Sequence, residues 1–477
     1  MVTVSSLERG LRKEAYRIES EAHAAGLDFF EVVFEMLDAR DVNAVAAYGG
    51  FPTRYSSWRF GMSFERLQKG YEYGLSKIYE LVINNDPTIA YLVRSNSLME
   101  QKLVMTHVFG HADFFKHNVW FSPTERQMVE SMERNAERIR GHMDALGQDV
   151  VESFMDVALA LEGLIDPYKP LRDMRAKSKR APGSSQGLAE RARRNLEAMI
   201  QLGGRVEVAR ATAKDAEFPT YDILGFLLEH APLPSWQQDV LRIVRDEAYY
   251  FAPQRMTKII NEGWASFWHS RLLTTGILDS SEIIDFADCH SGATATAPGQ
   301  LNPYKLGIEL FRHAELQGKD LFRLRSMHND VSFIDEIIDE EFTKRNSLFV
   351  YRKNARTGRN EVVDREWRSV KSELLRELSW GCTPQIQLVS VDAKGRGELR
   401  LQHVHDGRDI KLDEASQLVQ HIGSIWGGPV NLHTLDDRQA RRVESDGAEV
   451  RIVDDADEGP SLPNEVTEPG AGEESAA

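Results

Sequence analysis

The segment from Asn96 to Phe121, NSLMEQKLVMTHVFGHADFFKHNVWF, constrains the fold of this chain more than any other. Residues 97–109 contain no helix breaker and carry apolar side chains at helical spacing, which predicts an α-helix. His107 and His111 are four residues apart, so they lie one turn apart on the same face of that helix. Two imidazoles at this spacing can bind one metal ion. The alternative is a buried helix whose histidines bond to neighbouring polar groups.

A second segment, Asn261 to Leu273 (NEGWASFWHSRLL), carries a carboxylate and a further histidine. Glu262 and His269 are two helical turns apart and therefore lie on one face. Large aromatic residues cover the remaining surface, so this face is expected to point into the protein. Because an isolated buried charge is very costly, Glu262 needs a metal ion or a histidine as partner. An internal pair of Glu262 with His269 or with an arginine is the alternative.

These two segments supply the candidate site residues. The predicted metal ligands are His107, His111, Glu262 and His269. Three carboxylates are candidate catalytic bases: Glu100, Asp113 and Glu247. Glu100 lies two turns before the first histidine on the same face, and Asp113 follows the second histidine by two residues. Glu247 lies on the preceding predicted helix, from which it could reach the same interior as Glu262.

Composition restricts the class of protein. A chain of 477 residues with 42% hydrophobic and 28% charged residues is typical of a soluble globular protein with two or three domains. It contains no run of 18 apolar residues and no apolar signal-peptide core, so we expect no membrane span. The two cysteines, Cys289 and Cys382, are far apart, which favours the reducing cytoplasm. The net charge of −16 argues against a general nucleic-acid binder.

Residues 1–345 are predicted to form a mainly helical domain that contains the metal site. We expect one of its helices from about Asp28 to Leu37, where phenylalanines and valine alternate with acidic residues. From residue 71 to Asn84 we expect a strand or extended chain, and a helix is expected to begin near Pro87. The basic, Pro-, Gly- and Ser-rich residues 168–197 are expected to form a mobile excursion.

The periodicity changes from 3.6 to two residues near Ser347, which predicts a separate α+β domain over 346–436. Its elements follow the order β-α-β-β-α-β, which is that of a ferredoxin-like split sandwich with one antiparallel sheet. Residues 437–477 are rich in Asp, Glu, Gly and Pro and have almost no aromatic residues. They are expected to form a disordered acidic tail.

Several long motifs resemble those of the SpoVR family, named for stage V sporulation protein R. They are YEYGLSKIYELVINNDPTIAYL, NSLMEQKLVMTHVFGHADFFKHN, APLPSWQQDVLRIVRDEAYYFAPQRMTKIINEGWASFWH and LNPYKLG. The resemblance covers about residues 5 to 435. It implies a link to spore cortex formation, or to envelope or stress physiology in bacteria without spores. There the family's gene often neighbours those of a PrkA-like serine kinase and a von Willebrand-type protein, which are therefore the expected partners.

Two shorter motifs resemble metallopeptidase helices. HVFGH is similar to the HEFGH helix of helical zinc carboxypeptidases, and EGWASFWH is similar to the EGWAxYxE helix of some gluzincins. The resemblance implies a zincin-like helical domain in which His107, His111 and Glu262 hold a divalent metal, with zinc expected first. Two positions depart from this pattern. Val108 stands where the general-base glutamate is expected, and His269 replaces the final glutamate of the second helix.

The sequence leaves three functions open. The first is a metal-dependent hydrolase acting on a peptide or a peptidoglycan-derived amide, with a base other than residue 108. The second is a non-haem iron protein, because two histidines and one carboxylate also suit iron. The third is a non-catalytic adaptor that acts with the kinase and in which the polar cluster only stabilises the fold.

Overall fold

The computed structural model describes eight stretches of the chain. They are residues 2–3, 7–72, 80–179, 218–296, 299–354, 356–392, 397–447 and 449–455. The chain divides into two compact units, each built from two separate parts of the sequence: unit 1 is Met1–Glu152 with Tyr250–Cys382, and unit 2 is Ser153–Tyr249 with Thr383–Ala477. These units do not coincide with the expected domains 1–345 and 346–436, because local periodicity does not reveal which distant helices pack together.

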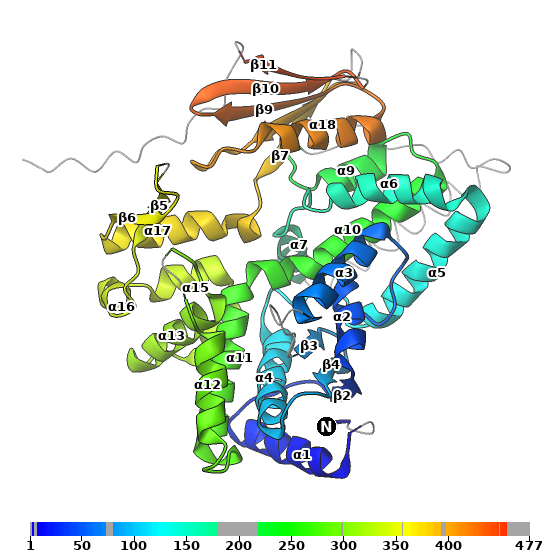
Figure 1. The fold of residues 1–477 in the computed structure, drawn as a ribbon. Coiled ribbons are helices and arrows are strands. Elements are labelled where there is room, and N and C mark those ends of the chain that lie inside the picture. Colours follow the sequence, from blue (N-terminus) through cyan, green and yellow to red (C-terminus); the bar gives the residue numbers. More distant parts are fainter. Residues whose placement is uncertain are drawn as a thin grey trace, which may run out of the picture. The chain divides into compact units, whose positions relative to one another are not determined.

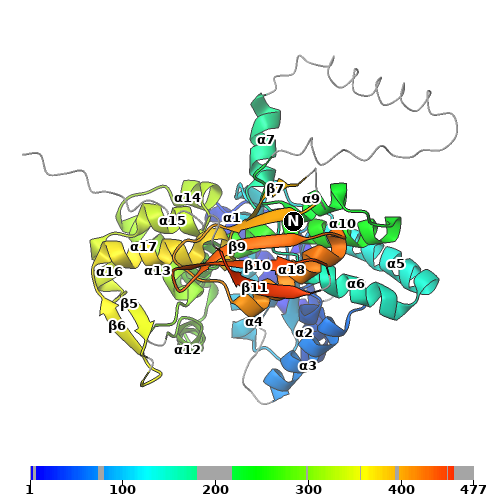
Figure 2. The same ribbon diagram turned by 90° about the horizontal axis from the view of Figure 1, so that it is seen from above.

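Figures 1 and 2 label most of the elements of both units. Unit 1 contains β1 (Val2–Thr3), α1 (Arg9–Ala24), β2 (Val32–Leu37), α2 (Ala39–Ala47), α3 (Trp58–Glu72), β3 (Glu80–Ile83), β4 (Thr88–Val93), α4 (Leu98–His117), α5 (Met128–Leu146), α11 (Lys258–Leu272), a π-helical turn (Leu273–Ile277), α12 (Ile283–Ala293), α13 (Pro303–Leu316), α14 (Leu321–Met327), α15 (Asp330–Ile337), α16 (Glu340–Arg345), β5 (Val350–Lys353), β6 (Asn360–Asp364), α17 (Trp367–Leu378) and a 3₁₀ turn (Ser379–Cys382).

Unit 2 contains α7 (Lys169–Lys179), α9 (Ile223–His230), β7 (Ile386–Val391), β8 (Leu399–His403), α18 (Leu412–Trp426), β9 (Val430–Asp436), β10 (Gln439–Ser445) and β11 (Val450–Asp454). Helices α6 (Gln148–Ala160) and α10 (Ser235–Met256) each contain one of the points at which the chain passes from one unit to the other. Helix α7 occupies the start of the basic segment that was expected to be a mobile excursion. The rest of that segment, from residue 180, lies outside the described residues.

Unit 1 includes a four-stranded sheet in the order β1-β2-β4-β3. Strands β1, β2 and β4 are parallel, and β3 is antiparallel to β4. The helix expected at residues 28–37 is therefore wrong, because its second half is strand β2. The helix expected from Pro87 is also wrong, because residues 88–93 form β4. In β2 the buried Val32 and Phe34 alternate with partly or fully exposed residues, and pairing with β4 decides the conformation.

Helix α4 is the helix predicted from residues 97–109, and it runs through the core of unit 1 beside α11 (Figure 1). Nearly every residue from Met99 to Phe115 is buried, so the helix has no broad solvent-facing side. Such a helix is buried on all faces, so its polar residues must find partners inside the protein. The capping box of Ser97 and Glu100 satisfies backbone donors at its N-terminus.

Two close contacts between helices depend on glycine. A Cβ atom on Gly110 of α4 would lie 2.7 Å from the Cα atom of Ala265 in α11. A Cβ atom on Gly307 of α13 would lie 2.2 Å from the carbonyl oxygen of Ile259 in α11. The backbones of α4 and α13 therefore approach α11 more closely than helices with larger side chains could.

The C-terminal strands form two sheets rather than one. Strands β5 and β6 pair as a two-stranded sheet in unit 1, whereas unit 2 has a five-stranded sheet in the order β11-β10-β9-β8-β7. Helix α18 packs against β9, β10 and β11 (Figure 2). The strands and helices expected between 346 and 436 are present, but the ferredoxin-like arrangement is wrong. Strands β8 and β9 are parallel, and β5 belongs to a different sheet from β7 and β8.

The predicted disordered tail begins too early. Residues 439–454 form β10 and β11, and Val443 of β10 is fully buried between its partners Leu432 and Ile452. Alternating apolar residues at these positions complete the sheet even though the segment is highly charged. Residues 456–477 lie outside the described part of the chain. No helix in the described part is long and apolar enough to cross a membrane.

Candidate metal centre

The contact between α4 and α11 positions the candidate ligands. Gly110 lies on the same face of α4 as His107 and His111, and it meets α11 at Ala265. Glu262 lies one turn before Ala265 and therefore faces the two histidines. The first turn of α11 is itself held in place from α15. The buried carboxylate of Asp330 accepts hydrogen bonds from the backbone N–H groups of residues 259 and 260, at 2.9 and 2.8 Å.

The structure brings His107, His111 and Glu262 together. Each residue offers one ligand atom, and these atoms all lie within 4.8 Å of one another. The Oε2 atom of Glu262 lies 3.3 Å from Nε2 of His107 and 3.5 Å from Nε2 of His111. All three side chains are buried. Two imidazole nitrogens and one carboxylate oxygen are a donor set that suits zinc or non-haem iron, so the group could hold a metal ion.

Hydrogen bonds on the other atoms of two ligands leave the facing atoms available. Nδ1 of His111 lies 2.9 Å from the amide oxygen of Asn261, which accepts a hydrogen bond from it. The Nε2 atom of His111 therefore carries the lone pair that a metal requires. The ammonium group of Lys258 donates to Oε1 of Glu262 at 2.6 Å, which leaves Oε2 directed at the histidines. Such outer contacts orient the ligands of metal sites.

His269 extends this arrangement outward. Its Nδ1 atom lies 2.8 Å from Nδ1 of His107, and its Nε2 atom lies 3.1 Å from Nδ1 of His290. If each ring donates to the next along this row, Nε2 of His107 is left with a lone pair toward Glu262. His269 was expected to be a fourth ligand. The structure instead places it behind His107, outside the group of three ligand atoms.

The charge states of the cluster follow from burial and from these contacts. Burial alone raises the pKa of Glu262, but hydrogen bonds from His107 and His111, when their facing Nε2 atoms are protonated, and the charge of Lys258 hold that pKa well below its ordinary value. A metal ion would take the place of the protons on the facing nitrogen atoms. Burial and the charge of His107 hold the pKa of His269 well below its ordinary value. An ionised carboxylate beside neutral imidazoles is the protonation state in which such residues bind metals.

Two of the expected catalytic bases have other roles. Glu100 lies at the N-terminus of α4, where its carboxylate accepts the backbone N–H of Ser97 at 2.7 Å. Asp113 is fully buried and accepts hydrogen bonds from the indole of Trp264 and from Arg325, at 2.9 and 3.1 Å. It also accepts the backbone N–H of Asp28 at 2.9 Å. Burial raises the pKa of Asp113, although the charge of Arg325 opposes this effect.

The third expected base, Glu247, is a buried residue of α10 that belongs to unit 2. It is not a member of the group of ligand atoms found among the described residues. Val108, which stands at the position of the base in the resembling peptidases, is fully buried in the core. The carboxylate nearest to both histidines in this site is therefore Glu262 itself.

Four residues of the centre were not predicted from the sequence: Asn261, Lys258, Tyr304 and His290. Asn261 directly precedes Glu262, and Lys258 lies one turn before it, so helical spacing was the available signal. The ring of Tyr304 lies 6.3 Å from the ring of His107, and Nζ of Lys258 lies 5.8 Å from the Tyr304 ring. No local signal links Tyr304 to the site, because it reaches the site from α13.

Comparison with known proteins supports a single family. A family model described as "SpoVR like protein" matches residues 6–382, and one described as "SpoVR-like C-terminal domain" matches residues 384–437. The chain is also similar to an Escherichia coli K12 protein described as "Uncharacterized protein YcgB". The two are 27% identical over 464 residues, which cover 87% of this chain and 90% of that protein. No solved structure matches the chain.

Proposed function

The chain belongs to the SpoVR family, as its motifs predicted, and we propose that it is a metal-dependent hydrolase of amide bonds. His107, His111 and Glu262 are the proposed ligands. One observation carries this proposal. Three buried side chains from two helices direct their ligand atoms at one another within 4.8 Å, while their other polar atoms are bonded elsewhere. We propose zinc, because two histidines and one carboxylate with an open position form a known catalytic zinc set.

A bound divalent ion would supply a Lewis acid that polarises a carbonyl group and makes water more acidic. The chain's own residues would then perform two tasks around the ion. His107, His111 and Glu262 hold the ion, and His269 and Asn261 orient the two imidazoles.

Lys258, whose side chain is 56% exposed, supplies positive charge at the edge of the site. There it can stabilise negative charge that develops on the substrate.

The missing base at Val108 restricts the expected activity. An aliphatic side chain cannot accept a proton from water, and a positioned base typically contributes about 10²–10⁴-fold to a rate. We therefore propose slow, selective hydrolysis of a particular amide rather than general peptidase activity. A peptidoglycan-derived peptide remains the proposed substrate, in keeping with the family's association with the spore cortex and the cell envelope.

Elemental analysis tests the metal directly. Protein purified without a polyhistidine tag or chelator should contain about one zinc ion per chain. His111→Ala should lose the ion, whereas His142→Ala, which changes a half-buried histidine of α5, should retain it. If the parent protein binds no divalent ion although the three side chains are intact, the metal hypothesis is wrong and the cluster is a purely polar part of the core.

Non-haem iron is the second candidate, and the buried Val108 favours it. Two histidines and one carboxylate without an adjacent base also bind iron in oxidative enzymes. The same elemental analysis distinguishes the two proposals. Iron that binds in stoichiometric amount and undergoes reversible oxidation would support this candidate over the hydrolase.

A non-catalytic adaptor acting with a PrkA-like serine kinase and a von Willebrand-type protein is the third proposal, and it rests on the family association alone. Purified kinase and SpoVR-family chain should form a complex in gel filtration if the adaptor is correct. The His111→Ala variant should still bind the kinase if the metal centre only stabilises the fold.

A further inference from the structure

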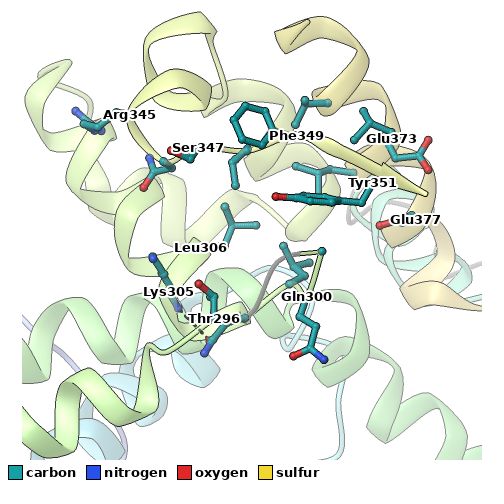
Figure 3. A pocket seen from close by; sticks show the side chains of 18 residues that line it. Thr296, Gln300, Lys305, Leu306, Arg345, Ser347, Phe349, Tyr351, Glu373 and Glu377 are labelled. Atoms are coloured by element: carbon teal, nitrogen blue, oxygen red, sulfur yellow. Dashed lines mark hydrogen bonds between the residues drawn. The ribbon is translucent and has the colours of Figure 1, made fainter. Parts of the chain in front are cut away.

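Unit 1 also contains a cavity that is separate from the three ligand atoms. This cavity of about 520 Å³ lies between the N-terminus of α13, the chain around β5, and α17 (Figure 3). Pockets of this volume are typical of those that bind small ligands. The cavity is separate from the group of ligand atoms, yet one turn of helix connects the two. Tyr304 of α13 faces His107, and the next two residues, Lys305 and Leu306, line the cavity.

Apolar side chains form much of the cavity wall. Phe349 and Tyr351 lie on the side of β5, and Leu306 lies across from them (Figure 3). Val370 and Leu374 of α17 are buried beside them. Apolar walls of this kind bury the aliphatic or aromatic part of a ligand.

The charges at the cavity are not evenly distributed. Lys305 and Arg345 lie at one side, and Glu373 and Glu377 lie at the other (Figure 3). The basic side has an available cation, because Lys305 is exposed and has no carboxylate partner among the described residues. On the acidic side, Glu373 is already neutralised by Arg352 of β5 and Arg376 of α17. The cavity therefore favours a single negative charge on the ligand at its Lys305 side.

Hydrogen-bonding groups also line the cavity, beside its apolar side chains. Thr296, Gln300 and Ser347 contribute hydroxyl and amide groups to the lining. A fatty acyl chain would remove these groups from water without giving them partners, which costs free energy. A polyanion such as a nucleotide would find too little positive charge, because Arg345 already lies 3.9 Å from Glu341 and only Lys305 is left for the ligand. A peptide matches all three features, because its backbone amides can bond to the polar groups while its side chains contact the apolar wall.

We propose that this cavity binds the C-terminal end of a short peptide. The terminal carboxylate pairs with Lys305 at the rim of the cavity. An apolar side chain of the peptide packs against Leu306, Phe349 and Leu374. This inference deepens the proposed function by assigning a place where the C-terminal end of a peptide substrate binds. It rests on that function only for the link to hydrolysis, since binding is measured without turnover.

The test compares two peptides that differ in one charge. The probes are acetyl-Ala-Ala-Leu with a free carboxylate and the same peptide with a C-terminal amide, each titrated into the full chain by calorimetry. An ion pair at a partly exposed site contributes up to about 1 kcal/mol, so the free acid should bind about three- to fivefold more tightly. Lys305→Gln should remove this difference, and Lys305→Arg should retain it. Lys13→Gln on the exposed surface of α1 is the matched control and should change nothing.

Three results would overturn the peptide site. They are equal affinity for the acid and the amide, no binding of either at ~5 mM, and tighter binding of decanoate than of the peptide acid. The titration is repeated with His111→Ala. Unchanged peptide binding in a variant that has lost its metal supports the cavity independently. If the parent binds peptide but contains no metal, the hydrolase fails and the peptide site remains.

Discussion

Gly110 of α4 packs directly on the backbone of Ala265 in α11, and this contact sets the spacing of the candidate metal centre. A Cβ atom on Gly110 would lie 2.7 Å from the Cα atom of Ala265, closer than such atoms normally approach. Gly110 sits between His107 and His111 on the facing side of its helix. The two histidines can therefore meet Glu262 only because residue 110 has no side chain.

Replacing this glycine gives the first prediction. Gly110→Ala should force α4 and α11 apart, destabilise the chain by about 1–3 kcal/mol and weaken metal binding, although every ligand is still present. Gly141→Ala in α5 is the control, because a Cβ atom there would meet nothing within 4 Å. Alanine should be neutral there or stabilise the helix by roughly 0.5–1 kcal/mol. Urea denaturation and zinc titration of both variants measure the two effects. Full metal affinity in Gly110→Ala would show that the close contact does not position the ligands.

The second prediction concerns Asp113, which was expected to be catalytic but is bonded to Arg325 and Trp264 in the core. Breaking a buried ion pair leaves an uncompensated charge and typically costs about 3–5 kcal/mol. Asp113→Asn should therefore lower stability by this amount. Glu100→Gln, which alters the capping box of α4, should cost about 1 kcal/mol or less. An Asp113→Asn protein of normal stability that has lost hydrolytic activity would restore Asp113 as a base.

The third prediction concerns the C-terminal strands. Removing residues 439–477 deletes β10 and β11, including the buried Val443, and leaves β9 as an edge strand paired only with β8. Unit 2 should lose its cooperative unfolding transition or melt about ten degrees lower. Removing only residues 456–477, which contain few apolar side chains, should shift the melting temperature by no more than about two degrees. Equal melting temperatures for the two truncated proteins would contradict the role given to β10 and β11.

The fourth prediction follows from His403 of β8. Burial and the charge of His405 lower the pKa of His403 to about 4, although Asp406 and Asp409 oppose this effect. The unfolded chain binds this proton near pH 6.5, so between about pH 6.5 and pH 4 the unfolded state holds more protons than the folded state. Stability should therefore fall as the pH drops through this window.

The measurement compares unfolding free energies at pH 7 and pH 5. His403→Gln keeps a hydrogen-bonding group near Thr434, which lies 2.9 Å from Nδ1 of His403, but removes the titration. The variant should lose about 2 kcal/mol less than the parent over this interval. An identical loss in parent and variant would mean that other groups cause the acid sensitivity.

The sequence by itself determined the two helices that carry the candidate ligands. Residues 97–109 and 261–273 have helical periodicity over several turns, and this signal depends only on neighbouring residues. The need of buried polar groups for partners also led to the expectation that Glu262 would meet His107 and His111. The structure brings these three residues together across 151 positions of sequence between His111 and Glu262.

Tertiary structure decided what local pattern could not. Whether residues 32–37 and 88–93 form helix or strand depended on their pairing with each other, more than fifty residues apart. The partner of Asp113 is Arg325, 212 residues away, and no local pattern indicated that this candidate base bonds to a buried arginine. His269 became an outer partner because the contact of α4 with α11 placed it behind His107. In each case a short-range pattern allowed two outcomes, and a long-range contact supplied the free energy that chose between them.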